Sequence, residues 1–195
     1  MSKPEKSPAK RLISVRDDLL EEVYRASVKE DTTAVKFVEE AIKYALKISQ
    51  LGIESSRLLE LCEVMQAYRA LGGVFVPKDV LTFLVSRAGS EAKQPLQAQW
   101  YETGLWYGKF LKEKFSDPVQ AFKSFLEVTR WDLNEVDLTR DRQGDFVKLR
   151  FISTLLSNDE TAFLAKFAEG VMSSLGYHLV NCDSLRGIAA MEFKK

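Results

Sequence analysis

The sequence has little of the chemistry on which most enzymes and metal sites depend. It contains two cysteines, Cys62 and Cys182, which are far apart and outside any Cys-x-x-Cys spacing, and a single histidine, His178. Two distant thiols do not indicate a disulfide framework, and a lone imidazole has no neighbouring ligands with which to hold a metal. We therefore expect both cysteines to be small buried residues, His178 to be a structural strand residue, and the protein to use no metal and no cofactor.

Long apolar runs and an excess of charge are missing as well. No apolar run approaches the roughly 18 residues of a membrane span, and Met1–Lys6 has none of the hydrophobic segment of a signal peptide. The formal net charge of zero argues against a chain that coats nucleic acid by bulk charge, although a dimer needs only a local basic patch. With 46% hydrophobic and 29% charged residues, we expect a globular cytoplasmic protein without a membrane partner.

No catalytic constellation is visible. Acidic pairs fall on the solvated faces of predicted helices, at Asp17-Asp18, Glu21-Glu22 and Glu39-Glu40. General acid–base catalysis needs partners such as a nucleophile, a glycine-rich phosphate loop or a metal motif, and none accompanies these carboxylates. The sequence therefore predicts a protein that is not an enzyme.

Basic residues concentrate at the start of the chain. Against one acid, Glu5, residues 1–16 carry Lys3, Lys6, Lys10, Arg11 and Arg16. Residues 1–9 contain proline, serine and lysine with almost nothing apolar, which indicates a flexible basic arm.

From residue 10 onward, apolar residues alternate. Ile13 and Val15 fall on one face of an extended chain. The other face carries Leu12, Ser14 and Arg16. Because a strand of about seven residues that runs directly into helices cannot satisfy its own edges, it needs a partner. The simplest partner is the same strand of a second chain.

Two short helices are predicted after this segment. Asp17 or Asp18 can cap the first, which continues at helical spacing to about Glu30. The second begins near Thr33, and its apolar stripe consists of Val35, Val38, Ile42 and Ala45. Few folds place strand, helix, turn and helix in so short a segment.

Residues 10–48 combine Arg11-Leu12-Ile13-Ser14-Val15-Arg16, Asp18-Leu19-Leu20-Glu21-Glu22-Val23, Thr33 and Val38-Glu39-Glu40-Ala41-Ile42. In this order and spacing they resemble the ribbon-helix-helix family of DNA-binding proteins. The resemblance implies an intertwined homodimer in which the strands of two chains form an antiparallel β-ribbon. That ribbon would lie in the major groove of double-stranded DNA, with Ile13 and Val15 pointing into the dimer core.

The resemblance also implies which side chains touch DNA. Lys10, Leu12 and Ser14 would face the base edges, where lysine can donate to guanine, serine can pair with either base type and leucine can contact a thymine methyl. Arg11 and Arg16 would reach phosphates.

The start of the second helix is expected to be a phosphate clamp. Free backbone N–H groups at Thr33, Ala34 and Val35 combine there with the Thr33 hydroxyl and the positive end of the helix dipole. Lys36 lies close enough to add charge. The same geometry is that of an ordinary helix cap.

Residues 51–94 are predicted to form a helical connector. A helical pattern runs from Ile53 to about Leu71, Gly72-Gly73 breaks it, and a shorter helical pattern follows Pro77. Residues 88–95 have the composition of a linker.

Residues 95–195 are predicted to form an α+β domain with an antiparallel sheet. A long aromatic helix carries Gly104 and Gly108, a spacing that lets another backbone approach closely. A hairpin around Arg140–Gly144 and a helix from Asn158 follow, and two strands complete the domain.

This order of elements, with Glu169-Gly170, Leu175-Gly176-Tyr177 and Arg186-Gly187-Ile188, is similar to the vinyl-reductase-type ligand-sensing domains over about residues 95–193. Those domains are related in fold to haem-NO-binding domains and to transport-particle subunits. The resemblance implies a small apolar ligand or a second dimer interface. Trp106, Tyr107 and Phe110 are the candidates for lining a ligand pocket, and the alternative is that this aromatic stripe is plain core.

The sequence thus predicts an α+β protein with a ribbon-helix-helix domain at residues 10–50, a connector and a C-terminal domain. Its predicted function is a homodimeric DNA-binding transcriptional regulator whose C-terminal domain senses a small ligand or sets the oligomeric state. The alternative is a DNA-organising or segregation protein whose C-terminal domain bridges dimers. An antitoxin ranks third, because antitoxin tails are usually unfolded until bound.

Overall fold

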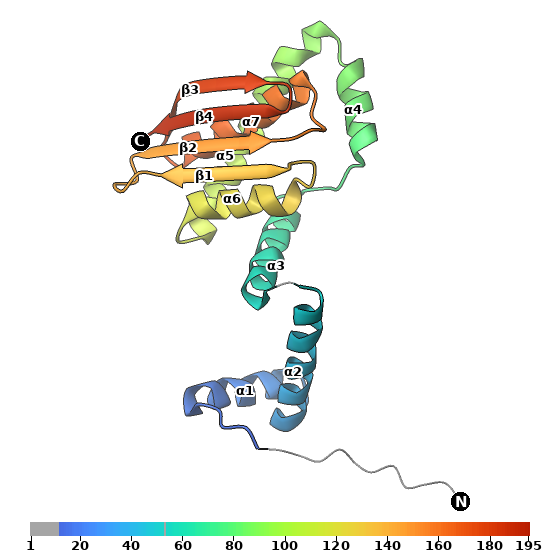
Figure 1. Ribbon diagram of the computed structural model, residues 1–195, viewed down its shortest axis with the longest axis vertical. Helices are drawn as coiled ribbons and strands as arrows, with labels where there is room; N and C mark the ends of the chain where they lie inside the picture. Colours follow the sequence, from blue (N-terminus) through green and yellow to red (C-terminus); the bar gives the residue numbers. More distant parts are fainter. Residues whose placement is uncertain (1–11, 53) are drawn as a thin grey trace, which may run out of the picture. The chain divides into compact units, whose positions relative to one another are not determined.

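The computed structural model describes residues 12–52 and 54–195. The helices in that part of the chain are α1 (Asp17–Lys29), α2 (Ala34–Gln50), α3 (Ser55–Ala70), α4 (Lys78–Arg87), α5 (Ser90–Lys114), α6 (Pro118–Thr129) and α7 (Asn158–Ser174). The strands are β1 (Glu135–Arg140), β2 (Phe146–Ile152), β3 (His178–Leu185) and β4 (Ile188–Lys194) (Figure 1). The chain divides into two compact units, residues 1–58 and 59–195.

The first unit is a pair of helices joined by a tight turn. Asp31, just after α1, takes a left-handed conformation with a φ of 51°, which aspartate adopts more readily than most residues. The Thr33 side chain accepts a hydrogen bond of 3.3 Å from the backbone N–H of Lys36 and so caps α2. Both helices that the sequence predicts in this region are present.

The β-ribbon expected at the N-terminus is absent from the described residues, and the fold class that includes it is wrong. Residues 12–16 belong to no strand, and α1 begins directly at Asp17. Alternating apolar residues indicate which side chains share a face, but a strand also requires a hydrogen-bonded neighbour. None of the described strands pairs with residues 12–16. The remainder of the expected strand, Lys10 and Arg11, and the basic arm 1–9 lie outside the described residues.

The first unit buries almost nothing of its own. Ser27 is its single buried residue in the described part of the chain. Large apolar side chains stay exposed along and around both helices, at Leu12, Ile13, Val15, Leu19, Tyr24, Val28, Val35, Ile42, Tyr44, Leu46 and Leu51. Two short helices cannot enclose a core, so this apolar surface has no cover within the unit.

The second unit is built on an antiparallel sheet with the strand order β1-β2-β4-β3. In the β1–β2 turn, a carboxylate oxygen of Asp141 accepts backbone hydrogen bonds from Asp145 at 2.9 Å and Phe146 at 3.1 Å. Gly144 has a φ of 75° there, a conformation that favours glycine. The antiparallel α+β arrangement expected for the C-terminal part is therefore present.

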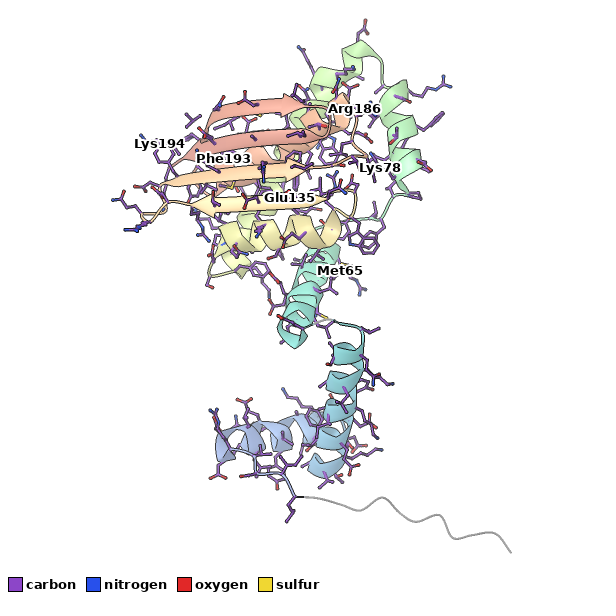
Figure 2. The ribbon with its side chains drawn as sticks, in the orientation of Figure 1. Met65, Lys78, Glu135, Arg186, Phe193 and Lys194 are labelled. Atoms are coloured by element: carbon purple, nitrogen blue, oxygen red, sulfur yellow. The ribbon has the colours of Figure 1, made fainter. Side chains whose placement is uncertain are left out.

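One face of this sheet is the core face. Buried residues alternate with exposed ones along the two central strands, at Val147, Leu149 and Phe151 of β2 and at Ala189, Met191 and Phe193 of β4 (Figure 2 labels Phe193). α7 packs against β3 and β4, α6 packs beside β1, and α5 packs against α7 (Figure 1). The period of two in the strands thus decides which side meets the helices.

Three glycines let α5 and α7 approach to backbone contact. A Cβ atom at Gly104 would lie 2.2 Å from the Phe167 carbonyl oxygen, and one at Gly170 would lie 2.1 Å from the Tyr101 carbonyl oxygen. At Gly108 a Cβ would lie 2.5 Å from the Val171 carbonyl oxygen. The close approach that the spacing of Gly104 and Gly108 predicts is present, and its partner is α7.

The segment expected to connect two domains is structured in a different way. Residues 90–95 are not a linker, because α5 already begins at Ser90 and contains Pro95. Pro95 is the sixth residue of α5 and removes one intrahelical hydrogen bond, while Lys93 Nζ lies 2.9 Å from a carboxylate oxygen of Asp159 on α7. Val64 of α3 is buried in the core of the second unit.

None of the helices in residues 12–52 and 54–195 is long and apolar enough to cross a membrane.

Replacement of Gly104 by alanine should destabilise the protein. The added methyl group would overlap the Phe167 carbonyl, and separating α5 from α7 should lower the free energy of unfolding by about 2 kcal/mol or more. Urea unfolding of the full chain measures the change.

Gly89→Ala is the matched control, because a Cβ at Gly89 meets no atom within 4 Å. That variant should change the free energy of unfolding by less than about 1 kcal/mol. Equal stability of the two variants would contradict the glycine contact.

Candidate functional site

The second unit contains a cavity of about 630 Å³, which is within the range of about 300 to 1,000 Å³ typical of small-molecule sites. Its walls come from the end of α3, from residues 72–81, from α5, α6 and α7, and from the loops after α6 and β2. The lining residues are Tyr68, Gly72, Gly73, Val74, Phe75, Val76, Lys78, Leu81, Trp100, Thr103, Tyr107, Phe125, Leu126, Thr129, Arg130, Trp131, Asp132, Leu155, Leu164 and Phe167. Most of this surface is aromatic or aliphatic.

Aromatic rings brace one another around the cavity. The Tyr107 ring meets the rings of Phe125 and Phe167 edge-on, with centroids 5.3 and 5.2 Å apart. Trp100 packs edge-on against Phe167 at 6.1 Å. Such pairs hold large rings in place with little conformational freedom, so the α5 side of the cavity is a rigid apolar wall.

Residues 72–87 cover another side of the cavity. The covering segment begins at Gly72, which has a φ of 75°, and the Tyr68 hydroxyl donates a hydrogen bond of 2.6 Å to the Val74 carbonyl. The Phe75 ring lies between those of Tyr68 and Trp131, at 5.3 and 6.1 Å. None of the residues of α4 is fully buried, and Lys78 and Leu81 of this helix line the cavity.

Glu160 is the main polar anchor of α4. Its carboxylate pairs with Lys78, at the start of α4 (Figure 2), and accepts a hydrogen bond of 3.0 Å from the Thr82 hydroxyl. The second oxygen accepts the backbone N–H of Ser157 at 2.9 Å, which completes the capping box of α7. Burial by itself would raise the pKa of Glu160, but hydrogen bonds from Lys78, Ser157 and Thr82 outweigh it and lower the pKa to about 2. Glu160 is therefore ionised and fully partnered.

The other charged side chains at the cavity are also paired. The Arg130 guanidinium donates two hydrogen bonds of 2.8 Å to the Asp132 carboxylate. Burial acts to raise the pKa of Asp132, and the bonds from Arg130 more than reverse this, so the pKa lies below its usual value. The cavity wall consequently carries ion pairs and no isolated charge in the described part of the chain.

Two tyrosines, Tyr68 and Tyr107, line the cavity. Burial raises the pKa of Tyr107, and the neighbouring Tyr68 raises it further. Burial also raises the pKa of Tyr68, more than Arg130 and the hydrogen bond to Val74 lower it. Both hydroxyls keep their protons at neutral pH and can donate hydrogen bonds.

Of the three pocket residues that the sequence indicates, Tyr107 lines the cavity. Trp106 is 69% exposed, with Lys109 Nζ 5.7 Å from its ring centroid, and Phe110 is not among the lining residues. Trp106 points about 100° away from Tyr107 around the helix, whereas Phe110 shares the face of Tyr107 but lies almost one turn farther along α5. The sequence does not indicate Tyr68, Phe75 and Lys78 as pocket residues, because residues 51–94 have the pattern of a helical connector. The run Val74-Phe75-Val76 after two glycines was the available signal.

The residues of the predicted phosphate clamp lie at the start of α2, where Thr33 is the N-cap. Thr33, Val35 and Lys36 are exposed, Ala34 is half-buried, and the Thr33 hydroxyl oxygen is already engaged by the Lys36 N–H. The backbone N–H groups of Ala34 and Val35 have no backbone partner in the described residues. Arg16 is exposed and donates a hydrogen bond of 3.0 Å to Asp18.

The remaining candidates are dispersed. Leu12 and Ser14 are exposed in the segment before α1, whereas Lys10 and Arg11 lie outside the described residues. Cys62 and Cys182 are both exposed, so the expectation that they are buried is wrong. His178 is the exposed first residue of β3. No group of three or more His, Cys, Asp or Glu side chains in the described residues could hold a metal ion.

No model of a protein family matches this chain, and no curated protein matches it. The chemistry of its own residues must therefore carry the functional argument.

The Glu160 anchor predicts a pH-dependent stability. A carboxylate with a pKa lowered from 4.5 to about 2 on folding contributes stability that is fully present above pH 5 or so. As the pH falls toward 2, about 3 kcal/mol of this contribution should be lost. Urea unfolding between pH 7 and about pH 2.5 measures the dependence.

Glu160→Gln should reduce stability at neutral pH and flatten the acid limb. Glu135→Gln is the control, because Glu135 forms an exposed pair with Arg150 on the sheet, and exposed pairs contribute little. An acid limb of unchanged slope in Glu160→Gln would refute the role of this carboxylate.

Proposed function

We propose that the protein is a DNA-binding transcriptional regulator that acts as a homodimer and carries a small-ligand site in its second unit. The observation that carries the proposal is the exposed apolar surface of α1 and α2. It lies on the same pair of helices as the start of α2, whose free backbone N–H groups could bind a phosphate. As a regulator of transcription, it would act in the cytoplasm.

The need for a second copy follows from the burial pattern. In the described part of this unit of two short helices, Ser27 is the only buried residue. The unit therefore has no core of its own. Contiguous exposed apolar surface marks an interaction site in most proteins. A second copy presents the same surface, and a two-fold interface lets both copies cover it at once. Exposed apolar residues such as Ile42 and Leu46 of α2 would then form the dimer core.

DNA contact is assigned to the start of α2 and to the basic N-terminal residues. The Ala34 and Val35 N–H groups, the helix dipole and the Lys36 ammonium favour an anion at this place. Because residues 12–16 form no strand, contact through a ribbon is no longer part of the proposed mode. A dimer would present two such helix starts to the phosphates of one duplex.

The cavity supports ligand sensing over the alternative of a DNA-organising protein that bridges dimers. Bridging needs an external surface, whereas a half-open cavity of about 630 Å³ with a mainly apolar lining suits a small apolar molecule. A regulator with such a site can couple the concentration of that molecule to its activity.

The dimer can be tested by charge substitution. Ile42→Glu places a carboxylate on the apolar face of α2 and should convert the 22.2 kDa chain from dimer to monomer at micromolar concentration. Sedimentation velocity measures the mass. Lys43→Glu is the control on the wet side of the same helix and should leave the dimer intact. A wild-type chain that is monomeric throughout would refute the proposed assembly.

DNA binding can be tested through its salt dependence. Lys36→Gln should weaken binding to promoter duplexes and reduce the slope of log affinity against log salt by about one unit per neutralised phosphate contact. Lys10→Gln should act in the same way. Fluorescence anisotropy at several salt concentrations measures both quantities.

Lys43→Gln, two helical turns beyond Lys36 on α2, should leave the slope unchanged. No detectable affinity of the wild-type protein for any duplex at low salt would refute DNA binding.

A further inference from the structure

The hydrogen-bonding groups of the cavity define what it can hold. The hydroxyls of Thr103 and Thr129 each donate to a carbonyl of their own helix, those of Gln99 at 2.8 Å and Phe125 at 2.7 Å. The Tyr68 hydroxyl donates to the Val74 carbonyl. These three hydroxyls are therefore already committed as donors within the protein.

The charged side chains that line the cavity are also paired within the protein. Lys78 is held by Glu160, and Arg130 is held by Asp132 through two hydrogen bonds. Each basic side chain keeps further N–H donors, but its charge is already neutralised by a carboxylate of the protein. A charged ligand would add an uncompensated charge to a largely apolar cavity, so it is disfavoured.

The Tyr107 hydroxyl is the exception among the hydroxyl-bearing lining residues. It has no hydrogen-bond partner among the described residues, although its ring is fixed by Phe125 and Phe167. Among the uncharged lining side chains, the others without such a partner there are the indole N–H groups of Trp100 and Trp131, which can only donate. The cavity thus offers uncommitted donors on a rigid apolar wall.

We infer that the cavity takes an uncharged, largely apolar ligand with a hydrogen-bond-accepting oxygen such as a carbonyl, and that the Tyr107 hydroxyl determines this specificity. The inference rests on the proposed ligand site and names its ligand class. A hydrocarbon would leave the Tyr107 hydroxyl unpaired. A carbonyl oxygen would accept a hydrogen bond from this hydroxyl while the remainder of the ligand packs against Phe125, Phe167 and Trp100.

Two dyes that differ in charge test the inference on the full chain. The uncharged carbonyl dye propionyl-dimethylaminonaphthalene should bind saturably, and the anionic dye anilinonaphthalene sulfonate should bind more weakly. Tyr107→Phe should raise the Kd of the carbonyl dye about three- to tenfold, as expected for loss of one hydrogen bond. Its bound emission should also shift to shorter wavelength, because the carbonyl loses its donor. Trp106→Phe, one residue away and outside the cavity, should change neither quantity.

A matched pair of competitors gives a second readout that needs no comparison of absolute affinities. Acetylnaphthalene and ethylnaphthalene have nearly the same shape and differ in one carbonyl oxygen. In the wild-type protein, acetylnaphthalene should displace the dye at the lower concentration. Tyr107→Phe should reduce this preference about three- to tenfold. Thermal unfolding of each variant shows that it is folded, and the preference in the wild-type protein stands even if Tyr107→Phe does not fold.

Tighter binding of the anionic dye, a wild-type preference for ethylnaphthalene, or a Tyr107→Phe variant with unchanged Kd and emission would overturn the inference. If neither dye binds saturably, the cavity is not a ligand site and that part of the proposed function fails with it. The dimer and DNA experiments are independent of all these outcomes.

Discussion

The backbone contact between α5 and α7 is the constraint on which the rest of the second unit depends. Gly104, Gly108 and Gly170 remove the side chains that would otherwise separate the two helices. Closely packed helices fix the directions of the residues beside the contact, and Tyr107 and Phe167 are such residues. Their rings meet edge-on and form the wall of the cavity. A wider crossing would change both the wall and the seat of α7 on the sheet.

Ion pairs neutralise the charged side chains at the cavity. Glu160 and Asp132 each hold a basic side chain at the cavity edge, and both have lowered pKa values because those bonds outweigh the effect of burial. The cavity is consequently lined mainly by apolar side chains, and the charged side chains at its edge neutralise one another. In the same contacts Glu160 anchors α4, so the residues that neutralise the cavity also hold its cover.

The two units differ in how far each can stabilise itself. The second unit has a continuous core that runs from Val64 to Phe193. The first unit has helices with well-formed ends but no core, since Thr33 caps α2 while residues such as Val35 and Ile42 remain exposed. Helix ends are stabilised locally, whereas a core requires enough chain to enclose it. This contrast is why a second copy is central to the proposed function.

Local features follow from residue type and spacing. They include the cap of α2, the break at Gly72-Gly73, the hairpins and the close approach at Gly104. Features that depend on distant partners are set by the tertiary structure. Residues 12–16 alternate like a strand yet pair with no described strand, residues 90–95 look like a linker yet belong to a helix packed on α7, and Cys182 is exposed on the edge strand β3. The cavity joins Tyr68 and Phe75 to Tyr107, and no periodicity shows which residues far apart in sequence meet.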